Sequence, residues 1–240
     1  MYQVQKSLCG LSKVHIVRGN EACDLDSAVC AVVYAFYLHQ TQSESSIPVV
    51  PLLNLVEADY VLHTEVTYAL QDCGITQELL IFRDQVNLTD LHESHRLVLT
   101  LVDHNAMSPE ERSLEGAVCE VVDHHTRVKE FPPSVDVTLE LVGSCCSLVA
   151  EKLLNDARFD VDPLVAHLLL GTILLDTVCL VDGKKKDVCQ AERLEILLPG
   201  ESRQETYEAL LGARRQISAP NIPDVLWFQC YLHLMFSAKT

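Results

Sequence analysis

Carboxylate and imidazole side chains recur at four points of the chain, each where an apolar segment ends. They are Asp24 and Asp26 after residues 14–19, Asp103 after residues 97–102, Asp123-His124-His125 after residues 118–122, and Asp176 after residues 171–175. In an open α/β sheet the carboxyl ends of the strands form the edge where ligands bind. Oxygen-rich ligand sets with few imidazoles suit Mn²⁺ or Mg²⁺ better than Zn²⁺. The four motifs therefore predict one metal-bearing site.

Two of these motifs also have an ordinary structural explanation. Asp26 or Ser27 has the alternative role of a helix N-cap, because small polar residues favour that position. Asp103 has the alternative role of a plain loop residue, and the neighbouring His104 is either a second ligand or a turn residue that faces solvent.

The other two motifs constrain the chemistry more tightly. Adjacent side chains seldom share one ion comfortably, so the pair His124-His125 offers one imidazole to a metal and the other to a substrate oxygen. Asp176 lies in an apolar helical pattern, where an unpaired buried carboxylate is costly. We therefore expect a metal or a hydrogen-bond donor beside Asp176.

Short β-branched runs alternate with helix-like segments along the chain. The runs that predict strands are residues 14–18, 49–53, 79–82, 97–102, 118–122 and 135–141, several of them apolar on both faces. Helical spacing of apolar residues predicts helices at residues 27–39, 58–71, 144–154 and 163–175. This alternation predicts an α/β fold in which a mostly parallel sheet carries helices on both faces.

A change in composition suggests a second domain. Residues 182–187 contain Gly183 and Lys184-Lys185-Lys186, which is typical of a linker. We expect a first domain over residues 1–181 that carries the metal site, and a second over residues 188–240. Within the second, residues 188–212 have a helical pattern, whereas residues 218–240 form an apolar tail.

Composition limits the classes of function. The 240 residues are 48% hydrophobic, which supports a substantial core, but no apolar run reaches the roughly 18 to 20 residues of a membrane span. Because the N-terminus also lacks the layout of a signal peptide, we expect a cytoplasmic protein. The ten cysteines include no C-x-x-C pair, which favours reduced, mostly buried thiols. A formal charge of −16 argues against binding to duplex nucleic acid, which needs Lys and Arg.

The ordered motifs resemble those of a known family. They read Asn20-x-x-x-Asp24-x-Asp26-Ser27, Leu101-Val102-Asp103, Val122-Asp123-His124-His125 and Gly171-Thr172-x-x-x-Asp176. This set resembles the DHH phosphoesterase superfamily, in its branch of family II pyrophosphatases and exopolyphosphatases. Residues 19–27, 81–84 and 140–145 look most like the animal prune exopolyphosphatases, and the likeness covers about residues 14–215.

The resemblance implies a role for each matched residue. Asp103 would bridge two divalent ions, Mn²⁺ or Mg²⁺, whose full ligand set would be Asp24, Asp26, Asp103, His124 and Asp176. Asp123 would orient the histidines, and His125 would contact the phosphate or protonate the leaving oxygen. Asn20 stands where the pyrophosphatases have His and matches the exopolyphosphatase branch, which favours a longer substrate. His125, Asp103 and Asn20 are thus the catalytic candidates.

The implied reaction is hydrolysis of the terminal phosphoanhydride of short-chain inorganic polyphosphate or a similar small phosphoanhydride. Two ions about 3.5 to 4 Å apart would generate a bridging hydroxide and hold the attacked phosphoryl group. The P-loop motif of nucleotide hydrolases is absent.

Family members have a C-terminal domain, here termed DHHA2-like, whose basic residues close over the substrate. Because this chain ends at Thr240, we expect that lid to be incomplete and activity to be reduced. The remaining basic candidates for phosphate contact, unless they are solvated surface residues, are Lys184, Lys185, Lys186, Arg214 and Arg215.

Two other functions stay open at this point. Prune relatives imply a cyclic-nucleotide phosphodiesterase as one alternative. The other is a regulatory protein of low turnover that keeps the metal site and binds partners such as nucleoside diphosphate kinases. The intact metal set favours an enzyme, whereas the incomplete lid favours the regulatory protein.

Overall fold

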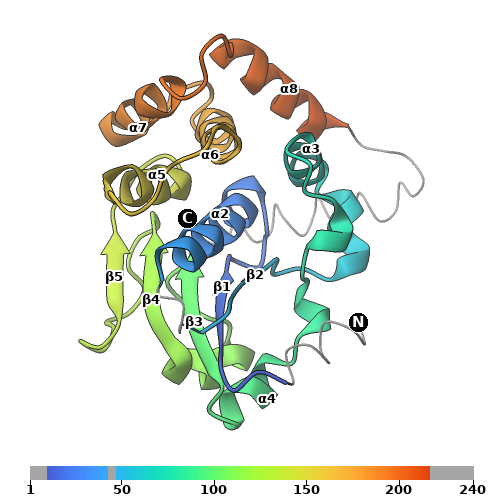
Figure 1. Cartoon of the computed structure of the whole chain (residues 1–240), viewed down its shortest axis with the longest axis vertical. Helices are drawn as coiled ribbons and strands as arrows, with labels where there is room; N and C mark the ends of the chain where they lie inside the picture. The colour runs from blue at the N-terminus through green and yellow to red at the C-terminus, as the bar shows by residue number, and fades with distance from the viewer. Residues whose placement is uncertain (1–9, 43–46, 217–240) are drawn as a thin grey trace.

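The computed structural model describes residues 10–42 and 47–216 (Figure 1). Its five-stranded sheet has the order β2-β1-β3-β4-β5, and every neighbouring pair is parallel. The strands are β1 (Val14–Arg18), β2 (Val49–Leu52), β3 (Leu97–Val102), β4 (Val118–Asp123) and β5 (Asp136–Leu139). Since the chain moves from β1 to one side and returns to β3 on the other, the switch point of the sheet lies between β1 and β3.

Helices cover both faces of this sheet. The α-helices are α2 (Leu25–Thr41), α3 (Thr64–Asp72), α4 (Leu88–Glu93), α5 (Cys145–Asn155), α6 (Pro163–Asp176), α7 (Lys185–Glu195) and α8 (Arg203–Arg215). Short 3₁₀ helices are η1 (Glu57–Leu62), η2 (Gln77–Leu79), η3 (Arg83–Gln85) and η4 (Pro109–Ala117). Two neighbouring residues of β1 pack on opposite faces of the sheet. Val17 joins the apolar cluster of α2, α5 and α6, whereas Ile16 joins the cluster of α4 and η4. The predicted α/β fold is confirmed.

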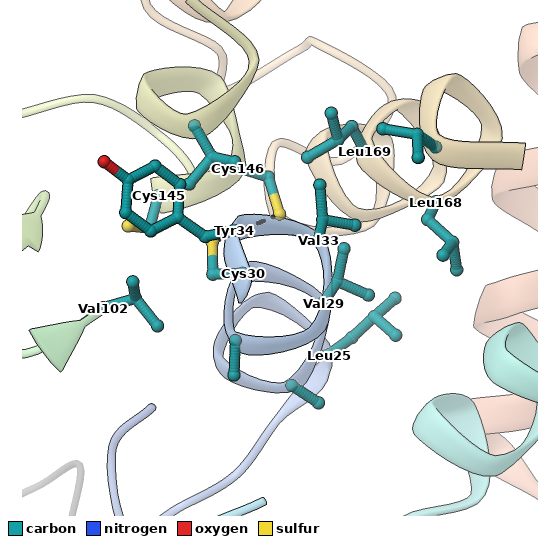
Figure 2. Close-up of a cluster of buried hydrophobic side chains, with 14 of the residues drawn as sticks. Leu25, Val29, Cys30, Val33, Tyr34, Val102, Cys145, Cys146, Leu168 and Leu169 are labelled. Carbon is teal, nitrogen blue, oxygen red and sulfur yellow. Dashed lines mark hydrogen bonds between the residues drawn. The ribbon is translucent and has the colours of Figure 1, made fainter. Parts of the chain in front are cut away.

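Helix α2 packs between α5 and α6 (Figure 2). Val29 of α2 lies toward Leu169 of α6, and both are 0% exposed. On the other side Cys30 points at Cys146 of α5, with a distance of 3.4 Å between the two Sγ atoms. The burial of each such apolar side chain stabilises the fold by about 1.5 to 3 kcal/mol. The eight described cysteines are all free thiols, four of them buried.

Residues 79–82 do not form the predicted strand. Helix η2 ends at Leu79, which is 69% exposed, and Phe82 makes one isolated parallel bridge with Leu53. The expected helix over residues 58–71 is instead divided at His63 into η1 and α3. Helices α4 and η4 were not predicted, because each is short and mostly polar.

The region after residue 182 also differs from the prediction. Helix α7 begins at Lys185, inside the expected linker, and the expected helix over residues 188–212 is two helices separated at Pro199-Gly200. Gly200 has a φ of +93°, a left-handed conformation that favours glycine and ends the helical path.

The described part of the second predicted domain shares the core of the first. Leu194 of α7 and Leu210 of α8 belong to the same apolar cluster as α2, α5 and α6. The domain division stays a prediction, and residues 218–240 lie outside the described residues. Over residues 10–42 and 47–216, the helices are too short or too polar for any of them to cross a bilayer.

Candidate metal centre

The four acidic motifs meet at the carboxyl edge of the sheet, beside the switch point between β1 and β3. A cavity of about 460 Å³ lies there. The metal-ligand and catalytic candidates of the sequence all line it, namely Asn20, Asp24, Asp26, Asp103, His124, His125 and Asp176. The fold therefore brings together residues that are up to 156 positions apart in the chain, from Asn20 to Asp176.

The first motif forms a tight turn from β1 into α2. The backbone N–H of Asn20 donates to Ser27 Oγ at 2.6 Å. A Cβ on Gly19 would lie 2.2 Å from the same Oγ, so only glycine fits at that position. Asp24 caps α2 by accepting the N–H of Ser27 at 3.1 Å. The cap is thus Asp24, and the alternative of Asp26 or Ser27 as the cap is wrong.

Asp26 belongs to the first turn of α2, and its side chain lies at the N-terminus of a second helix, α5. Its carboxylate accepts hydrogen bonds from Ser144 Oγ at 2.9 Å and from the backbone N–H groups of Cys145 at 2.6 Å and Cys146 at 2.9 Å. The N-terminal end of a helix stabilises negative charge. These contacts hold the 3% exposed Asp26 in one orientation.

Asp103 follows β3 and is held by the amide of Asn20. Asn20 Nδ2 donates to Asp103 Oδ2 at 2.7 Å, and Asn20 Oδ1 accepts the N–H groups of Ala22 at 2.8 Å and Cys23 at 3.1 Å. Asp103 has a φ of +59°, a conformation that is uncommon for residues other than glycine and that clusters at functional sites. It is a structured turn residue, not a plain loop residue.

The two histidines after β4 face different partners. His124 Nε2 lies 3.1 Å from Asp103 Oδ1 and 3.6 Å from Asp26 Oδ2, while its Nδ1 lies 3.1 Å from the carbonyl oxygen of Val142. His125 Nδ1 donates to Asp123 Oδ1 at 2.8 Å. His125 Nδ1 also lies 3.8 Å from Asp103 Oδ1, and the division of roles between the two imidazoles stays a prediction.

Asp123 is the 0% exposed residue that fixes this pair. Its Oδ1 also accepts the backbone N–H groups of His124 at 2.8 Å and His125 at 3.2 Å, and its Oδ2 accepts Asn105 Nδ2 at 2.5 Å. Burial acts to raise the pKa of Asp123, but the hydrogen bond and charge of His125 outweigh it and lower that pKa. A charged Asp123 therefore requires that His125 Nδ1 carry a proton.

Asp176 is the last residue of α6 and points into the same cavity. Arg214 of α8 lies 3.9 Å from its Oδ1, whereas its buried Oδ2 has no hydrogen-bond partner among the described residues. A buried carboxylate oxygen without a donor is costly unless a cation binds it.

Burial, followed by mutual repulsion, dominates the electrostatics of the cavity. Burial and the charge of Asp26 raise the pKa values of Asp24, Asp103 and Asp176 above the ordinary value for aspartate. Burial acts to lower the pKa of His124, but its hydrogen bond to Asp103 and the charge of Asp26 raise that pKa to about 11. The carboxylates thus attract positive charge strongly.

These residues fit the divalent ions that the sequence predicts. Four carboxylates and one imidazole supply hard oxygen ligands with little nitrogen, which suits Mn²⁺ or Mg²⁺. The ligand atoms of Asp103, His124 and His125 all lie within 4.8 Å of one another. His125 is thus close enough to be a ligand as well as a substrate contact. The number of ions and the assignment of each ligand stay predictions.

The basic candidates lie in different surroundings. Lys186 Nζ pairs with Glu140 and with Glu151 at 2.6 Å, and Arg214 Nε lies 3.5 Å from Glu65. Lys184, Lys185 and Arg215 are exposed. Of the five candidates, Arg214 is the one that an ion pair links to a carboxylate of the cavity.

Sequence reasoning did not find several residues of the site. Asn105, two positions after Asp103, connects Asp123 to the loop at Val128, whose N–H donates to Asn105 Oδ1 at 2.8 Å. Arg18 and Glu111 also line the cavity and form an ion pair at 2.7 Å. The tripeptide Asp103-His104-Asn105 could have indicated Asn105, but nothing in the sequence pairs Arg18 with a residue 93 positions away.

His104 is neither a solvent-facing turn residue nor a clear ligand. It is partly buried, and its Nδ1 donates to the carbonyl oxygen of Val102 at 2.9 Å. Burial and the charge of Arg18 lower its pKa to about 4, so the imidazole is neutral at neutral pH.

Known proteins resemble this chain in sequence. The exopolyphosphatase PRUNE1 of Rattus norvegicus is 41% identical over 219 residues, which are 89% of this chain and 48% of the relative. The "Probable manganese-dependent inorganic pyrophosphatase" of Staphylococcus saprophyticus is 25% identical over 221 residues, 90% of this chain and 65% of the relative. The chain thus spans about half the length of the prune relative that it matches.

A solved structure has the same fold. The crystal structure of a Methanococcus jannaschii protein, a candidate family II inorganic pyrophosphatase, has a TM-score of 0.63 and 21% identity, and the match covers 83% of this chain and 60% of that one. A family model described as "DHH family, N-terminal domain" matches residues 14–175. The chain therefore belongs to the DHH family.

Proposed function

We propose that this chain is a metal-dependent hydrolase that releases orthophosphate from the end of short-chain inorganic polyphosphate. The observation that carries the proposal is the set of four carboxylates and His124 around one cavity at the switch point of the sheet, with Asp26 and Asp103 buried. The names of its relatives, exopolyphosphatase and manganese-dependent pyrophosphatase, agree with this chemistry.

Mn²⁺ or Mg²⁺ ions bound by Asp24, Asp26, Asp103, His124 and Asp176 would activate a water molecule and neutralise phosphate charge. Asp26 is oriented for this by the N-terminus of α5, and Asp103 by the amide of Asn20. His124 presents Nε2 to both of these carboxylates, because its Nδ1 faces the carbonyl oxygen of Val142.

His125 has the geometry of a proton donor to the leaving oxygen. Its Nδ1–H is bonded to Asp123, so its Nε2 is the atom that gives or takes a proton. Its side chain is 41% exposed, which lets it reach a substrate in the cavity. A positioned acid of this kind contributes about 10²- to 10⁴-fold to a rate.

Asn20 favours a substrate longer than pyrophosphate. Its amide donates to Asp103 and accepts two backbone N–H groups, so no ring nitrogen is available at this point to bind a metal. The metal centre would then polarise a bound phosphate differently from the centre of a pyrophosphatase that has histidine at this position.

We also propose that the protein is located in the cytoplasm.

A regulatory role with low turnover is the second candidate. Among the described residues that line the cavity there are seven acidic residues but one arginine and no lysine, so few cations face a phosphate. A nucleoside diphosphate kinase as the partner stays a prediction from the prune resemblance, and so does cyclic-nucleotide hydrolysis.

The test measures phosphate release from tripolyphosphate and pyrophosphate, and nucleoside monophosphate formation from a cyclic nucleotide, with Mn²⁺ or Mg²⁺ and with Asp103→Ala as the control. Release from tripolyphosphate that the variant lacks supports the proposal and ranks the substrates. Stoichiometric metal binding without release from any substrate favours the regulatory protein, and phosphate release that persists in Asp103→Ala contradicts the assigned site.

A further inference from the structure

One arginine lies among the acidic residues of the cavity. Arg18 is the last residue of β1, and its backbone is paired in register with Leu101, two residues before Asp103 on the neighbouring strand. Adjacent strands are about 4.8 Å apart, so Arg18 stands one strand from the predicted bridging ligand. Both residues line the same cavity.

Arg18 has the environment of an anion-binding residue. Its side chain is 1% exposed, and its Nη1 and Nη2 each donate to one oxygen of Glu111 at 2.7 Å. This two-pronged geometry is the one that arginine adopts with carboxylate and with phosphate. Its buried Nε has no hydrogen-bond partner among the described residues, so one donor of the guanidinium is left for a further acceptor.

Glu111 is well placed to give way to a substrate. It lies in the 3₁₀ helix η4 and lines the cavity, and its side chain is 21% exposed against 1% for Arg18. Short 3₁₀ segments are held by weaker hydrogen bonds than α-helices. The carboxylate therefore occupies an anion site that is built on the rigid strand and covered by a less rigid element.

We propose that Arg18 forms a second phosphate subsite, which Glu111 fills in the free protein and which a phosphate of a bound polyphosphate takes over. This inference rests on the proposed function and adds a basis for chain-length preference. Pyrophosphate places its two phosphates at the metal-binding carboxylates, whereas a longer chain has a further phosphate that reaches Arg18. Glu111 thus acts as an internal competitor that short ligands do not displace.

The decisive variant is Glu111→Gln, because it leaves Arg18 in place and removes the competing charge. Glu115→Gln is a matched control, since Glu115 lies in the same helix η4 but pairs with Lys129 and does not line the cavity. Dissociation constants for tripolyphosphate and pyrophosphate are measured by calorimetry with Mg²⁺. Both variants and the parent carry His125→Ala, which slows turnover during the measurement.

We expect Glu111→Gln to bind tripolyphosphate about tenfold more tightly than its parent, since one charge-assisted contact has that value. Its affinity for pyrophosphate and the affinities of Glu115→Gln should change less than twofold. Arg18→Lys should bind tripolyphosphate more weakly, because an ammonium group cannot make the two-pronged contact. Equal tightening for both ligands, or none for tripolyphosphate, would overturn the subsite.

Stability supplies a second readout that does not need turnover. Without Glu111 the buried guanidinium lacks a counter-charge, so Glu111→Gln should melt at a lower temperature than the parent. Tripolyphosphate should restore more of that loss than pyrophosphate does, and equal restoration contradicts the proposal. If the wild type releases no phosphate while these binding differences hold, the proposed function fails and the subsite stands. If the wild type releases phosphate but these binding differences are absent, the subsite is rejected and the proposed function stands.

Discussion

Two groups of buried carboxylates lie close together in this protein and are stabilised in opposite ways. Asp187 of α7 is 0% exposed, and its oxygens accept the N–H of Gly143 at 2.8 Å, the N–H of Lys184 at 2.6 Å and Ser147 Oγ at 2.6 Å. Asp176 is partly buried, and its buried Oδ2 has no donor among the described residues.

The difference separates a structural carboxylate from a ligand. Hydrogen bonds from the protein satisfy the carboxylate of Asp187 without any ion. At the cavity, by contrast, burial and neighbouring charge raise the pKa values of Asp24, Asp103 and Asp176. Such a cluster is stable when cations bind to it, and the unpartnered Oδ2 of Asp176 supports the proposal that this carboxylate is a metal ligand.

A comparison of Asp103→Ala with Asp187→Ala is the most direct test of the difference between the two kinds of carboxylate. We expect Asp103→Ala to lower phosphate release by about 10⁴-fold, because the proposed metal centre would lose its proposed bridging ligand and several kcal/mol of charge stabilisation. Its metal content, measured by atomic emission after gel filtration, should fall below that of the wild type. Asp187→Ala should keep its metal. Loss of metal from both variants alike would show that the two carboxylates do not differ.

His125→Ala tests the division of labour between the adjacent histidines. Because His125 Nδ1 lies 2.8 Å from Asp123 Oδ1 but 3.8 Å from Asp103 Oδ1, we expect turnover to fall by about 10³-fold while metal affinity changes little. His124→Ala should lose metal affinity as well, since Nε2 lies 3.1 Å from Asp103. Calorimetric titration with Mn²⁺ distinguishes them, and equal loss of affinity in the two variants would make His125 a ligand.

The sheet could be predicted from the sequence because its strands are continuous apolar runs. Val14–Arg18 and Leu97–Val102 are buried on both faces, and the prediction matches their bounds. Residues 79–82 have the same composition, but Leu79 is exposed and the segment is too short to extend the sheet. Composition cannot show that difference, since it depends on which neighbours the segment meets.

The positions of the site residues could be predicted, but their supporting contacts could not. Asp103 follows a strand, which places it at the carboxyl edge of a parallel sheet, whereas Asp176 is the last residue of helix α6 and reaches the same cavity through the packing of that helix. Asp187, by contrast, follows three lysines and has the pattern of a linker, although it is fully buried beneath the loop at Gly143. Contacts over tens of residues leave no periodic trace, so only the folded chain reveals them.

Asp187→Ala should have a smaller effect, on stability. The change leaves the buried Ser147 Oγ and the partly buried N–H groups of Gly143 and Lys184 without their acceptor, which costs about 3 kcal/mol of the free energy of unfolding. Urea denaturation in EDTA measures this loss. Asp182→Ala, which removes an exposed carboxylate from the same connection, is the control and should change stability by less than about 0.5 kcal/mol. An unchanged midpoint for Asp187→Ala would show that its hydrogen bonds are not structural.

Asp176→Asn should have the smallest effect on stability, and it should stabilise the metal-free protein, whereas Asp187→Ala destabilises it. In EDTA the substitution removes one of several repelling charges, while the amide keeps the size of the side chain. We expect it to raise the free energy of unfolding by about 1 kcal/mol, as for other substitutions that relieve a strained functional site. The stabilisation that Mn²⁺ gives the wild type should then shrink, because a ligand is missing. Thermal unfolding with and without Mn²⁺ measures both changes. If Asp176→Asn instead destabilises the metal-free protein as Asp187→Ala does, Asp176 is a structural residue whose hydrogen-bond donor lies elsewhere in the chain.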